Sequence, residues 1–243
     1  MCVKKATGSK LISGSNDNTI KIWNIETGVC LKTIKEHNNS VKSIEIISNN
    51  TFITCSHDGT SKLFDLNLFN CIRTFIVNNN VSTVVNENKL ISCGSQIKIL
   101  DLQTGECLKT IQDYANCVKC ISNELIITGS NNDNDIKVWN IDSGVCLKVL
   151  HGHSDLIQCI IQLTNELIVS CSDDQTIRVW NLNTEQCLKT IEEAHSNEIT
   201  CLAKLSENKI ISCSEDRTIK VWNIDTLSCL NTLNLYTFFM DVD

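Results

Sequence analysis

The sequence predicts an all-β protein built from six copies of one repeat, each with four short strands. Runs such as Thr176-Ile177-Arg178-Val179-Trp180 alternate polar and apolar residues, which is the pattern of a strand with one buried face. A motif that begins with cysteine returns about every 40 residues along the chain. No segment keeps a 3.6-residue period over three turns, so we expect no helix.

The recurring motif, Cys-Leu-Lys-Thr or a close variant, marks the last strand of every repeat. Its copies start at Cys30, Cys71, Cys107, Cys146, Cys187 and Cys229, at steps of 41, 36, 39, 41 and 42 residues. An aromatic or apolar residue and then Asn or Asp come before each copy: Trp23-Asn24, Phe64-Asp65, Leu100-Asp101, Trp139-Asn140, Trp180-Asn181 and Trp222-Asn223. These landmarks predict repeats at residues 1–35, 36–76, 77–112, 113–151, 152–192 and 193–234, and a C-terminal tail at 235–243.

Turn residues separate the strands within each repeat, as in Ser15-Asn16-Asp17-Asn18 and Glu26-Thr27-Gly28. Four strands of ~8–12 residues each, turn included, fill one repeat. A single sheet of this size cannot bury both of its faces, whereas sheets set around an axis bury their faces against their neighbours. Repeats of ~40–45 residues with a Trp-Asp dipeptide are typical of a β-propeller.

The segment from Ser13 to Asn24, Ser-Gly-Ser-x-Asp-x-Thr-Ile-Lys-Ile-Trp-Asn, resembles the repeat of the WD-repeat family. The resemblance extends over residues 1–234. It implies a propeller of six four-stranded WD-repeat blades and a non-catalytic scaffold that organises a multi-protein complex. It also implies a buried hydrogen-bonded set of His, Ser or Thr, Asp and Trp in each blade.

We assign these structural tetrads by spacing. Repeats five and six carry the full set, which is His153, Ser170, Asp174 and Trp180, and His195, Ser212, Asp216 and Trp222. Repeat two carries His37, Thr54 and Asp58, but Phe64 stands in place of the Trp and has no N–H to donate. Repeat one has Ser13, Asp17 and Trp23, and the sequence begins too late to supply its His. A buried Asp needs such partners, because an unpaired buried polar group costs ~1–3 kcal/mol.

Repeats three and four depart from this pattern. Repeat three has Val77 at the His position, Leu100 at the Trp position and a turn shortened at Gly94-Ser95. Repeat four has Tyr114 at the His position and one extra residue within positions 131–135. We expect both repeats to be less rigid than repeats five and six, unless their irregular turns are shaped for a partner.

The way in which the propeller closes has two open alternatives. No N-terminal strand that would complete the last blade is evident. Either six blades form a ring, sealed by packing of blade six on blade one, or the chain is a piece of a longer array; we favour the ring. The apolar tail from Leu235 to Met240 would cover an open blade face or contact a partner.

The composition argues against several classes of protein. Hydrophobic residues make up 42% of the chain, but no apolar run reaches the ~18–20 residues of a membrane span. The N-terminus lacks the apolar core of a signal peptide, so we expect a cytoplasmic protein that is not secreted, with the nucleus as the alternative. Fourteen of the fifteen cysteines fall at three repeat positions, which indicates small buried residues rather than disulfides. The pair Cys117 and Cys120 has no second pair for zinc, and we expect no metal or cofactor.

The charges point to protein partners. The net charge of −7 argues against nucleic acid, and eleven basic residues follow the repeats, where they protect the outer strands from pairing. Several acidic residues lie in loops that share one end of a propeller in this family: Asp155, Asp173, Glu192, Glu193, Glu198 and Glu215. This end is either a solvated acidic surface or a docking face for a basic peptide segment.

Function is predicted at the level of class. His153-Ser154-Asp155 is not a catalytic triad, because triads are assembled across a fold, and the sequence carries no enzyme motif or small-molecule site. We therefore predict a non-catalytic protein–protein interaction scaffold. The alternatives are a substrate-recognition subunit of a ubiquitin ligase or a fragment of a larger WD-repeat protein. The Arg typical of Cullin-4 adaptors, two places after Trp-Asp, is absent: these places hold Glu26, Asn67, Gln103, Asp142, Asn183 and Asp225.

Overall fold

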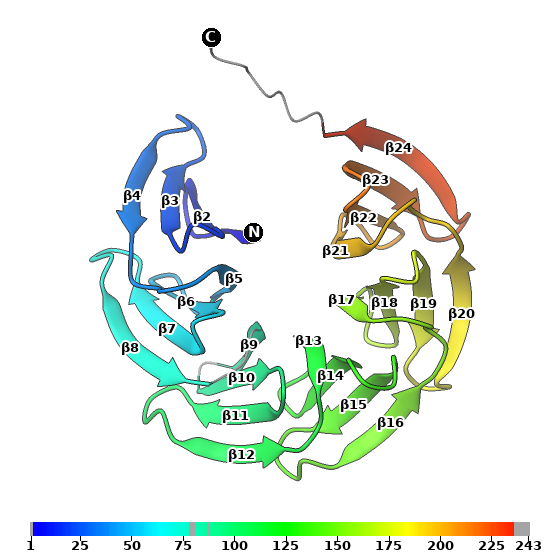
Figure 1. Ribbon diagram of the computed structural model, residues 1–243, viewed down its shortest axis with the longest axis horizontal. Coiled ribbons are helices and arrows are strands. Elements are labelled where there is room, and N and C mark those ends of the chain that lie inside the picture. The colour runs from blue at the N-terminus through cyan, green and yellow to red at the C-terminus, as the bar shows by residue number, and fades with distance from the viewer. Residues whose placement is uncertain (1, 78–80, 87, 236–243) are drawn as a thin grey trace. The chain divides into compact units, whose positions relative to one another are not determined.

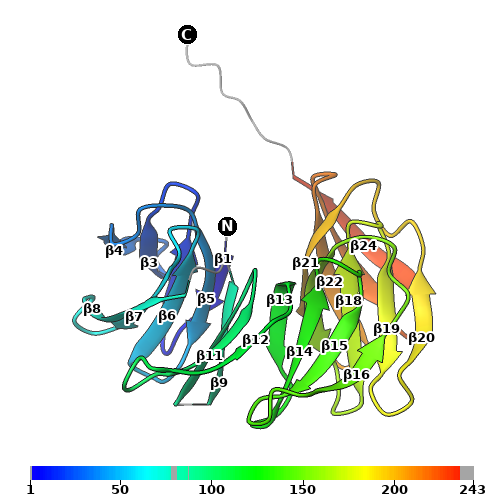
Figure 2. The ribbon, with the colours of Figure 1, turned by 60° about the horizontal axis from the view of Figure 1, so that its bottom comes forward.

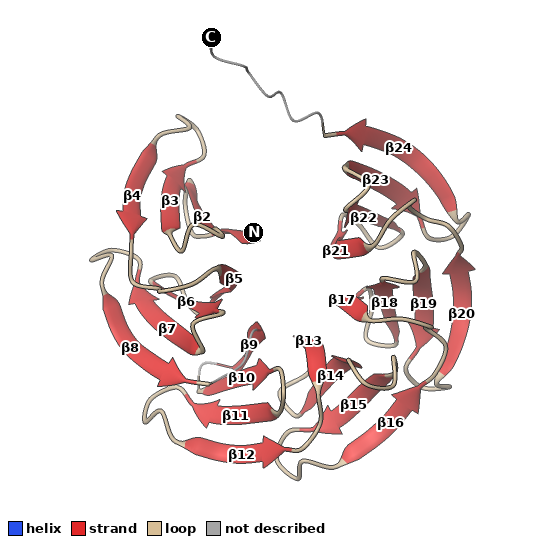
Figure 3. Cartoon of the chain, viewed as in Figure 1, coloured by secondary structure: helices blue, strands red, loops and turns tan. Residues whose placement is uncertain are grey.

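A computed structural model describes residues 2–77, 81–86 and 88–235 of the 243-residue chain. Twenty-four strands and no helix occur in these residues, as the single strand colour of Figure 3 shows. The described ranges therefore contain no helix of the length and apolar character that a membrane span requires. Of the predicted tail, only Leu235 is described, and it is exposed; positions 236–243 lie outside the described residues.

The strands form six antiparallel sheets of four, and each sheet follows chain order (Figures 1 and 2). Blade 1 contains β1 Cys2–Lys5, β2 Lys10–Gly14, β3 Ile20–Asn24 and β4 Cys30–Ile34; blade 2 contains β5 Val41–Ile46, β6 Thr51–Ser56, β7 Thr60–Asp65 and β8 Cys71–Ile76. Blade 3 contains β9 Val81–Asn86, β10 Lys89–Cys93, β11 Ile97–Asp101 and β12 Cys107–Ile111; blade 4 contains β13 Ala115–Cys120, β14 Leu125–Ser130, β15 Ile136–Asn140 and β16 Cys146–Leu150. Blade 5 contains β17 Ile157–Gln162, β18 Leu167–Ser172, β19 Ile177–Asn181 and β20 Gln186–Ile191; blade 6 contains β21 Ile199–Lys204, β22 Lys209–Ser214, β23 Thr218–Asn223 and β24 Ser228–Asn234. The expected class is confirmed: the fold is a β-propeller of six four-stranded blades.

The recurring cysteine has a fixed place in every blade. Trp180 of β19 lies opposite Cys187 of β20, and the register of the two strands shifts by one residue at this point. The same shift occurs between the third and fourth strands of the other five blades. Such a bulge increases the local twist of the outer strand. The recurring cysteine therefore lies opposite the aromatic or apolar residue at the bulge of every blade.

The Asn or Asp after the aromatic residue shapes the turn into the outer strand. Asn181 Oδ1 accepts hydrogen bonds from the backbone N–H groups of Asn183 and Thr184, at 2.8 and 3.0 Å. Asn24, Asp65, Asp101, Asn140 and Asn223 accept equivalent bonds. A short polar side chain that bonds to backbone N–H groups stabilises a turn. The first residue of the dipeptide is therefore buried in five blades and partly exposed in blade 1 (Trp23), and the second residue forms the turn.

The chain divides into two compact units. The first unit is Met1–Ile126 with Asn140–Val145, and the second is Ile127–Trp139 with Cys146–Asp243. In the first unit, blade 1 packs Ile12, Ile20, Ile22 and Ile34 against Val41, Ile44, Phe52, Phe64 and Leu66 of blade 2. We call the side of a blade that contacts the following blade its forward face, and the other side its backward face.

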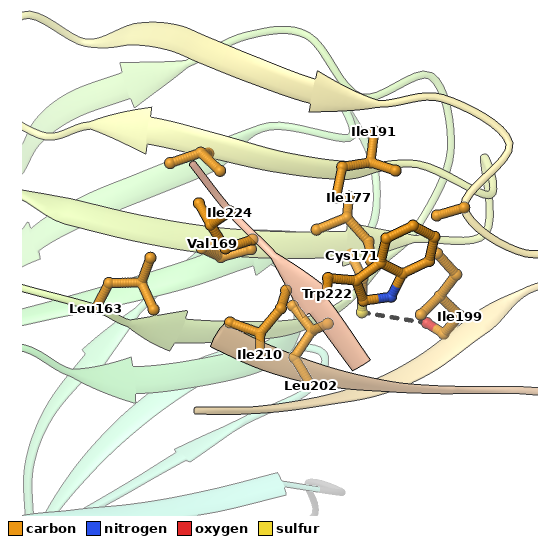
Figure 4. Close-up of a cluster of buried hydrophobic side chains, with 12 residues drawn as sticks. Leu163, Val169, Cys171, Ile177, Ile191, Ile199, Leu202, Ile210, Trp222 and Ile224 are labelled. Atoms are coloured by element: carbon orange, nitrogen blue, oxygen red, sulfur yellow. Dashed lines mark hydrogen bonds between the residues drawn. The ribbon is translucent and has the colours of Figure 1, made fainter. Parts of the chain in front are cut away.

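The second unit repeats this packing between blades 5 and 6 (Figure 4). The forward face of blade 5 contributes Val169, Cys171, Ile177, Val179 and Ile191, and the backward face of blade 6 contributes Ile199, Leu202, Ile210, Trp222 and Ile224. Cys171 Sγ lies 3.3 Å from the carbonyl oxygen of Ile199, a contact that crosses between the two blades. The apolar faces of adjacent sheets thus form the core, as expected for blades that cannot bury both faces alone.

Candidate functional site

Blades 5 and 6 each contain a buried chain of hydrogen bonds. In blade 5, Trp180 Nε1–H donates to Ser170 Oγ at 2.8 Å, and Ser170 Oγ lies 2.7 Å from His153 Nε2. His153 Nδ1–H donates to Asp174 Oδ2 at 2.7 Å. Blade 6 repeats these contacts in Trp222–Ser212, Ser212–His195 and His195–Asp216, at 2.8, 2.6 and 2.8 Å. Because the hydroxyl accepts from the indole, it donates to the imidazole, and the chain is saturated from end to end.

Each aspartate of these chains also joins two loops. Asp174 Oδ2 accepts the backbone N–H of Ser154, from the loop before β17, and Asp174 Oδ1 accepts the N–H and hydroxyl of Thr176. Asp216 makes the same bonds with Ser196 and Thr218. The loop that enters a blade is thereby tied to the turn between its second and third strands.

Blade 2 forms the same chain without an indole. His37 Nδ1 lies 2.8 Å from Asp58 Oδ2, and His37 Nε2 lies 2.8 Å from Thr54 Oγ1. Phe64 is fully buried and stacks on Phe52, with ring centroids 5.1 Å apart. Aromatic packing takes the place that an indole N–H contact has in blades 5 and 6.

The hydrogen bonds set the charge state of these groups. Burial by itself would raise the pKa of Asp174, but the bonds from His153 and Thr176 outweigh it and hold that pKa far below its usual range. The same balance holds the pKa of Asp58 and of Asp216 low. Burial lowers the pKa of His37 and of His195, in spite of the neighbouring carboxylate. A neutral imidazole beside an ionised aspartate is therefore the favoured state.

Blade 1 has the same groups without the imidazole. Trp23 Nε1–H donates to Ser13 Oγ at 2.8 Å, and Asp17 Oδ1 accepts the Thr19 hydroxyl at 2.6 Å. Asp17 is exposed, and Ser13 and Trp23 are partly exposed. Among the described residues, no histidine is hydrogen-bonded to Asp17 or Ser13, although His37 and Asp17 line one pocket.

Blade 3 replaces the polar chain with apolar packing. Val77 and Leu100, at the His and Trp positions, are buried in one cluster with Leu90 and Leu102. Among the residues of blade 3 that the structure describes, no aspartate is buried, so no buried carboxylate needs a partner there.

Blade 4 contains a contact between a buried aspartate and an exposed histidine that the spacing rule missed. Asp135 is buried and lies 2.8 Å from Nδ1 of His151, whereas Tyr114, at the expected His position, is exposed. The extra residue also shifts the hydroxyl, so Trp139 Nε1–H donates to Thr128 Oγ1 at 2.9 Å. A search that allowed one inserted residue would have found Thr128. No sequence signal pairs Asp135 with His151, because the two lie on different loops.

The acidic loop residues separate into a cluster and two outlying members. The charges of Asp155, Glu215 and Asp174 add to burial in raising the pKa of Asp173. The charges of Asp173, Glu215 and Asp155 raise the pKa of the exposed Glu198. We call Asp155, Asp173, Glu198 and Glu215 the acidic cluster. Glu192 and Glu193 are exposed in the loop before β21, and neither contributes to these shifts.

The frame of the acidic cluster is ordered by backbone contacts. Asp173 N–H donates to the Leu156 carbonyl, and Glu215 N–H donates to the Glu198 carbonyl, both at 3.0 Å. Gln158 Nε2 donates to both Asp173 carboxylate oxygens, at 3.0 and 3.1 Å. The cluster therefore occupies loops that the strands of blades 5 and 6 hold in place.

The basic residues of the outer strands have a role beyond protecting edges. Arg73 of β8 donates to the Thr104 carbonyl at 2.7 Å. Lys189 of β20 donates to the carbonyls of Ile224 and Asp225 at 3.0 and 3.2 Å, and Lys148 donates to the carbonyl of Leu182. In each case the acceptor lies in the turn between the third and fourth strands of the following blade. These cations therefore connect adjacent blades within each compact unit.

None of the fifteen cysteines forms a disulfide. Cys30, Cys107, Cys201 and Cys229 are exposed, so the expectation of buried cysteines is wrong for these four. Burial raises the pKa of Cys2 to about 11 and raises the pKa of Cys93 and Cys213. Among residues 2–77, 81–86 and 88–235, no group of three or more His, Cys, Asp or Glu side chains is arranged to hold a metal ion.

Two family models match the chain. The model described as WD domain, G-beta repeat matches residues 2–24, 28–65 and 185–223. The model described as DDB1- and CUL4-associated factor 12 beta propeller matches residues 94–194. Neither model describes an enzyme, and a WD-repeat propeller is typically a non-catalytic scaffold.

Similar proteins share only part of their length with this chain. Nuclear distribution protein PAC1 of Gibberella zeae is 31% identical over 135 residues, which is 48% of this chain and 29% of that protein. Periodic tryptophan protein 2 of Arabidopsis thaliana is 32% identical over 76 residues, which is 30% of this chain and 8% of that protein. COMPASS component SWD3 of Saccharomyces cerevisiae is 35% identical over 69 residues, which is 28% of this chain and 22% of that protein. With its six four-stranded blades and the matching repeats, this chain belongs to the WD-repeat β-propeller family.

Proposed function

We propose that this chain is a non-catalytic interaction module and that its acidic loops bind a basic segment of a partner protein. The single observation that carries the proposal is the acidic cluster, in which neighbouring carboxylates raise the pKa of Glu198 and add to the effect of burial on the pKa of Asp173. Mutual repulsion of this kind marks a region of negative potential, which a Lys- or Arg-rich segment would relieve. Glu192 and Glu193, in the loop before β21, extend the proposed face.

The loops that carry this face are well suited to recognition. Asp174 and Asp216 bond to the loops that enter blades 5 and 6, so the carboxylates are held by buried hydrogen bonds. Ordered loops lose little conformational freedom on binding, and binding residues are commonly found on loops of a rigid frame.

The test is a charge reversal measured by fluorescence anisotropy. The probe is a labelled peptide with five arginines separated by serines, and a peptide with glutamine in place of arginine checks that charge is required. The double variant Glu198→Lys with Glu215→Lys should weaken binding at least tenfold. Glu166→Lys with Glu207→Lys is the matched control, because these exposed residues lie in turns at the opposite end of the same blades. If the two double variants bind the arginine peptide equally well, the acidic loops are not the binding site for a basic segment.

A second candidate function is substrate recognition for a ubiquitin ligase. The match of residues 94–194 to the DDB1- and CUL4-associated factor 12 propeller favours it. The lack of arginine at the places held by Glu26, Asn67, Gln103, Asp142, Asn183 and Asp225 counts against it. Recovery of DDB1 in stoichiometric amounts with the tagged chain would support this candidate, and its absence from an otherwise intact complex would exclude it.

The cellular setting is part of the proposal. Fifteen cysteines without a disulfide are in keeping with a reducing compartment, so we place the protein in the cytoplasm, with the nucleus as the alternative. The chain spans 8% of Periodic tryptophan protein 2 and 29% of PAC1. A role as one module of a larger WD-repeat protein is therefore compatible with the interaction function proposed here.

A further inference from the structure

We propose that the outer strand of blade 2, β8, pairs with β8 of a second copy of this chain. β8 is the last strand of its sheet and, among the described strands, it pairs only with β7. Blade 2 packs against blades 1 and 3, and all three blades belong to the first compact unit. The open edge of β8 offers backbone donors and acceptors to a strand that can pair with it.

One face of β8 is apolar and exposed. Ile72 is 51% exposed and Ile76 is 74% exposed, and the exposed Thr74 lies between them on the same face. Arg73 and Phe75 face the other way, where Phe75 is buried against blade 3 and Arg73 bonds to a carbonyl of that blade. A second strand at this edge would therefore bring its own side chains beside the two isoleucines.

Ile76 distinguishes β8 from the other five outer strands. The fifth position after the recurring cysteine is polar or charged in the other blades, where it is Lys35, Gln112, His151, Glu192 or Asn234. A charged or polar residue on an edge strand deters pairing, because an incoming strand would have to cover it with an apolar side chain. Blade 2 lacks this protection at the corresponding position.

The backbone of β8 directs the exposed residues to the open edge. Val77 N–H donates to the Gly59 carbonyl at the end of the β7–β8 pair. Because backbone groups of alternate residues point the same way in an antiparallel strand, those of Ile72, Thr74 and Ile76 point away from β7. A two-fold axis at Thr74 then places Thr74 opposite its own copy and Ile72 opposite Ile76 of the second copy. Each of these pairs exchanges two N–H···O=C bonds.

The charges of β8 agree with this register. Arg73 is the only charged residue of the strand, and the two-fold axis places it opposite Phe75 of the second copy, so no like charges face each other. The same arrangement in β20 would set Leu188 against Glu192 and would desolvate a carboxylate without a cation beside it. Among the six outer strands, self-pairing is therefore favoured at β8.

The paired strands form a small interface. A strand of six residues from each copy buries less than the ~1,200 Å² at the lower end of stable protein interfaces. The dimer is therefore weak and reversible, and it forms at high protein concentration or where a larger assembly brings two copies together. β8 belongs to blade 2, whereas the acidic cluster belongs to blades 5 and 6, so this proposal does not depend on the binding of a basic segment.

Sedimentation velocity of the full chain over a wide range of protein concentration tests the dimer. The unchanged protein should pass from monomer to dimer as its concentration rises. Ile76→Lys places the residue type of Lys35 at this position of the repeat and should weaken dimerisation at least tenfold; because Ile76 is exposed, the variant is expected to fold. Leu188→Lys is the matched control, since Leu188 is 49% exposed on the outer strand of blade 5, and it should dimerise as the unchanged protein does.

Amide exchange in ¹⁵N-labelled protein tests the register of the pair. The N–H groups of Ile72, Thr74 and Ile76 should exchange more slowly as the concentration rises, while those of Arg73 and Phe75, which point to β7, should not change. A monomer at every concentration would overturn the proposal. So would a dimer that Ile76→Lys leaves intact, a dimer that Leu188→Lys weakens equally, or exchange of the three amides that does not depend on concentration.

Discussion

Asp174 and Asp216 remain ionised inside the protein mainly because they accept several hydrogen bonds. Each carboxylate accepts bonds from an imidazole, a threonine hydroxyl and backbone N–H groups. Such bonds favour the charged form strongly enough to overcome the desolvation that accompanies burial. Removing the carboxylate would leave the imidazole and several backbone donors without acceptors, and that loss is larger than the contribution of any one bond.

The position of the aspartate therefore decides how much it stabilises the fold. We expect Asp174→Ala to lower the free energy of unfolding by about 2–3 kcal/mol, because His153 N–H and the Ser154 N–H lose their acceptor in a partly buried site. Asp17→Ala in blade 1 should cost less than about 1 kcal/mol, since that residue is exposed and holds only its own turn. Urea denaturation of both variants measures the difference, and equal losses would contradict the assigned role of the buried chain.

Protonation of the buried histidines should couple stability to pH. The pKa of His37 and of His195 is lowered by burial, so between their folded pKa and about 6.5 the unfolded chain binds more protons than the folded chain. The free energy of unfolding therefore rises with pH in this window. The contribution of the neutral histidines to stability is lost as the pH falls below about 6.5. The low pKa of Asp58, Asp174 and Asp216 adds a second loss below about 4.

The measurement is the urea midpoint from pH 8 to pH 4. It should be constant above about pH 7 and should fall below about 6.5. Asp173 and Glu198 have a raised pKa, so they oppose this loss of stability as the pH falls toward the pKa range of carboxyl groups. The pH range in which the histidines titrate is therefore the cleaner test. His195→Asn should reduce the fall, and a midpoint that rises between pH 7 and pH 5.5 would show that the histidines are not held neutral.

At the scale of the element, the outer strand joins one blade to the next. Arg73, Lys148 and Lys189 each reach a carbonyl in a turn of the following blade. The long side chains carry their charged ends to these backbone carbonyls. The edge protection expected from the sequence and this connection between blades are compatible, because both need a long cation on the outermost strand.

Removal of one such contact should have a small, local effect. We expect Lys189→Met to lower the free energy of unfolding by about 0.5–1.5 kcal/mol, because methionine keeps the apolar stem but not the bonds to Ile224 and Asp225. Lys32→Met at the same repeat position, where none of these carbonyl bonds occurs, is the control and should be nearly neutral. Thermal or urea unfolding measures both variants. Equal losses of stability in Lys189→Met and Lys32→Met would contradict a stabilising contact between adjacent blades through Lys189.

At the scale of the whole molecule, charge is distributed unevenly. The chain carries a net charge of −7, and the acidic cluster draws four carboxylates from the loops of blades 5 and 6. The connecting cations lie on outer strands, so they do not neutralise this end. A negative region of this kind attracts a basic segment over about a Debye length, which is ~8–10 Å at physiological salt.

Association with the arginine peptide should therefore depend on salt. We expect the association rate constant to fall several-fold between low salt and physiological salt, with a smaller change in the dissociation rate, because screening acts mainly on the encounter. Stopped-flow fluorescence at several ionic strengths measures both rates. The Glu198→Lys with Glu215→Lys variant should lose this dependence, and a salt-independent rate in the unchanged protein would argue for an apolar binding mode.

The repeats alone were enough to predict the β class, the six blades and the four strands of each blade. The physical reason is that these features are local: a period-two pattern, a turn signal and a cysteine opposite an aromatic residue recur in register. The spacing of 21 residues between His153 and Asp174 could likewise be read along the chain, because a regular blade converts a fixed spacing into a fixed position. Where one residue is inserted, as in positions 131–135, the same rule failed to identify Thr128 and Asp135.

Only the tertiary structure decided which side chains from different loops come together. It places Glu198 close to Asp173 and Glu215, whereas Glu192 and Glu193, adjacent in sequence to the same strand, take no part in that cluster. It likewise pairs His151 with Asp135 and joins Arg73 to the turn at Thr104. These contacts depend on the separation of neighbouring sheets and on the path of irregular loops, and neither is encoded by a periodic pattern within one repeat.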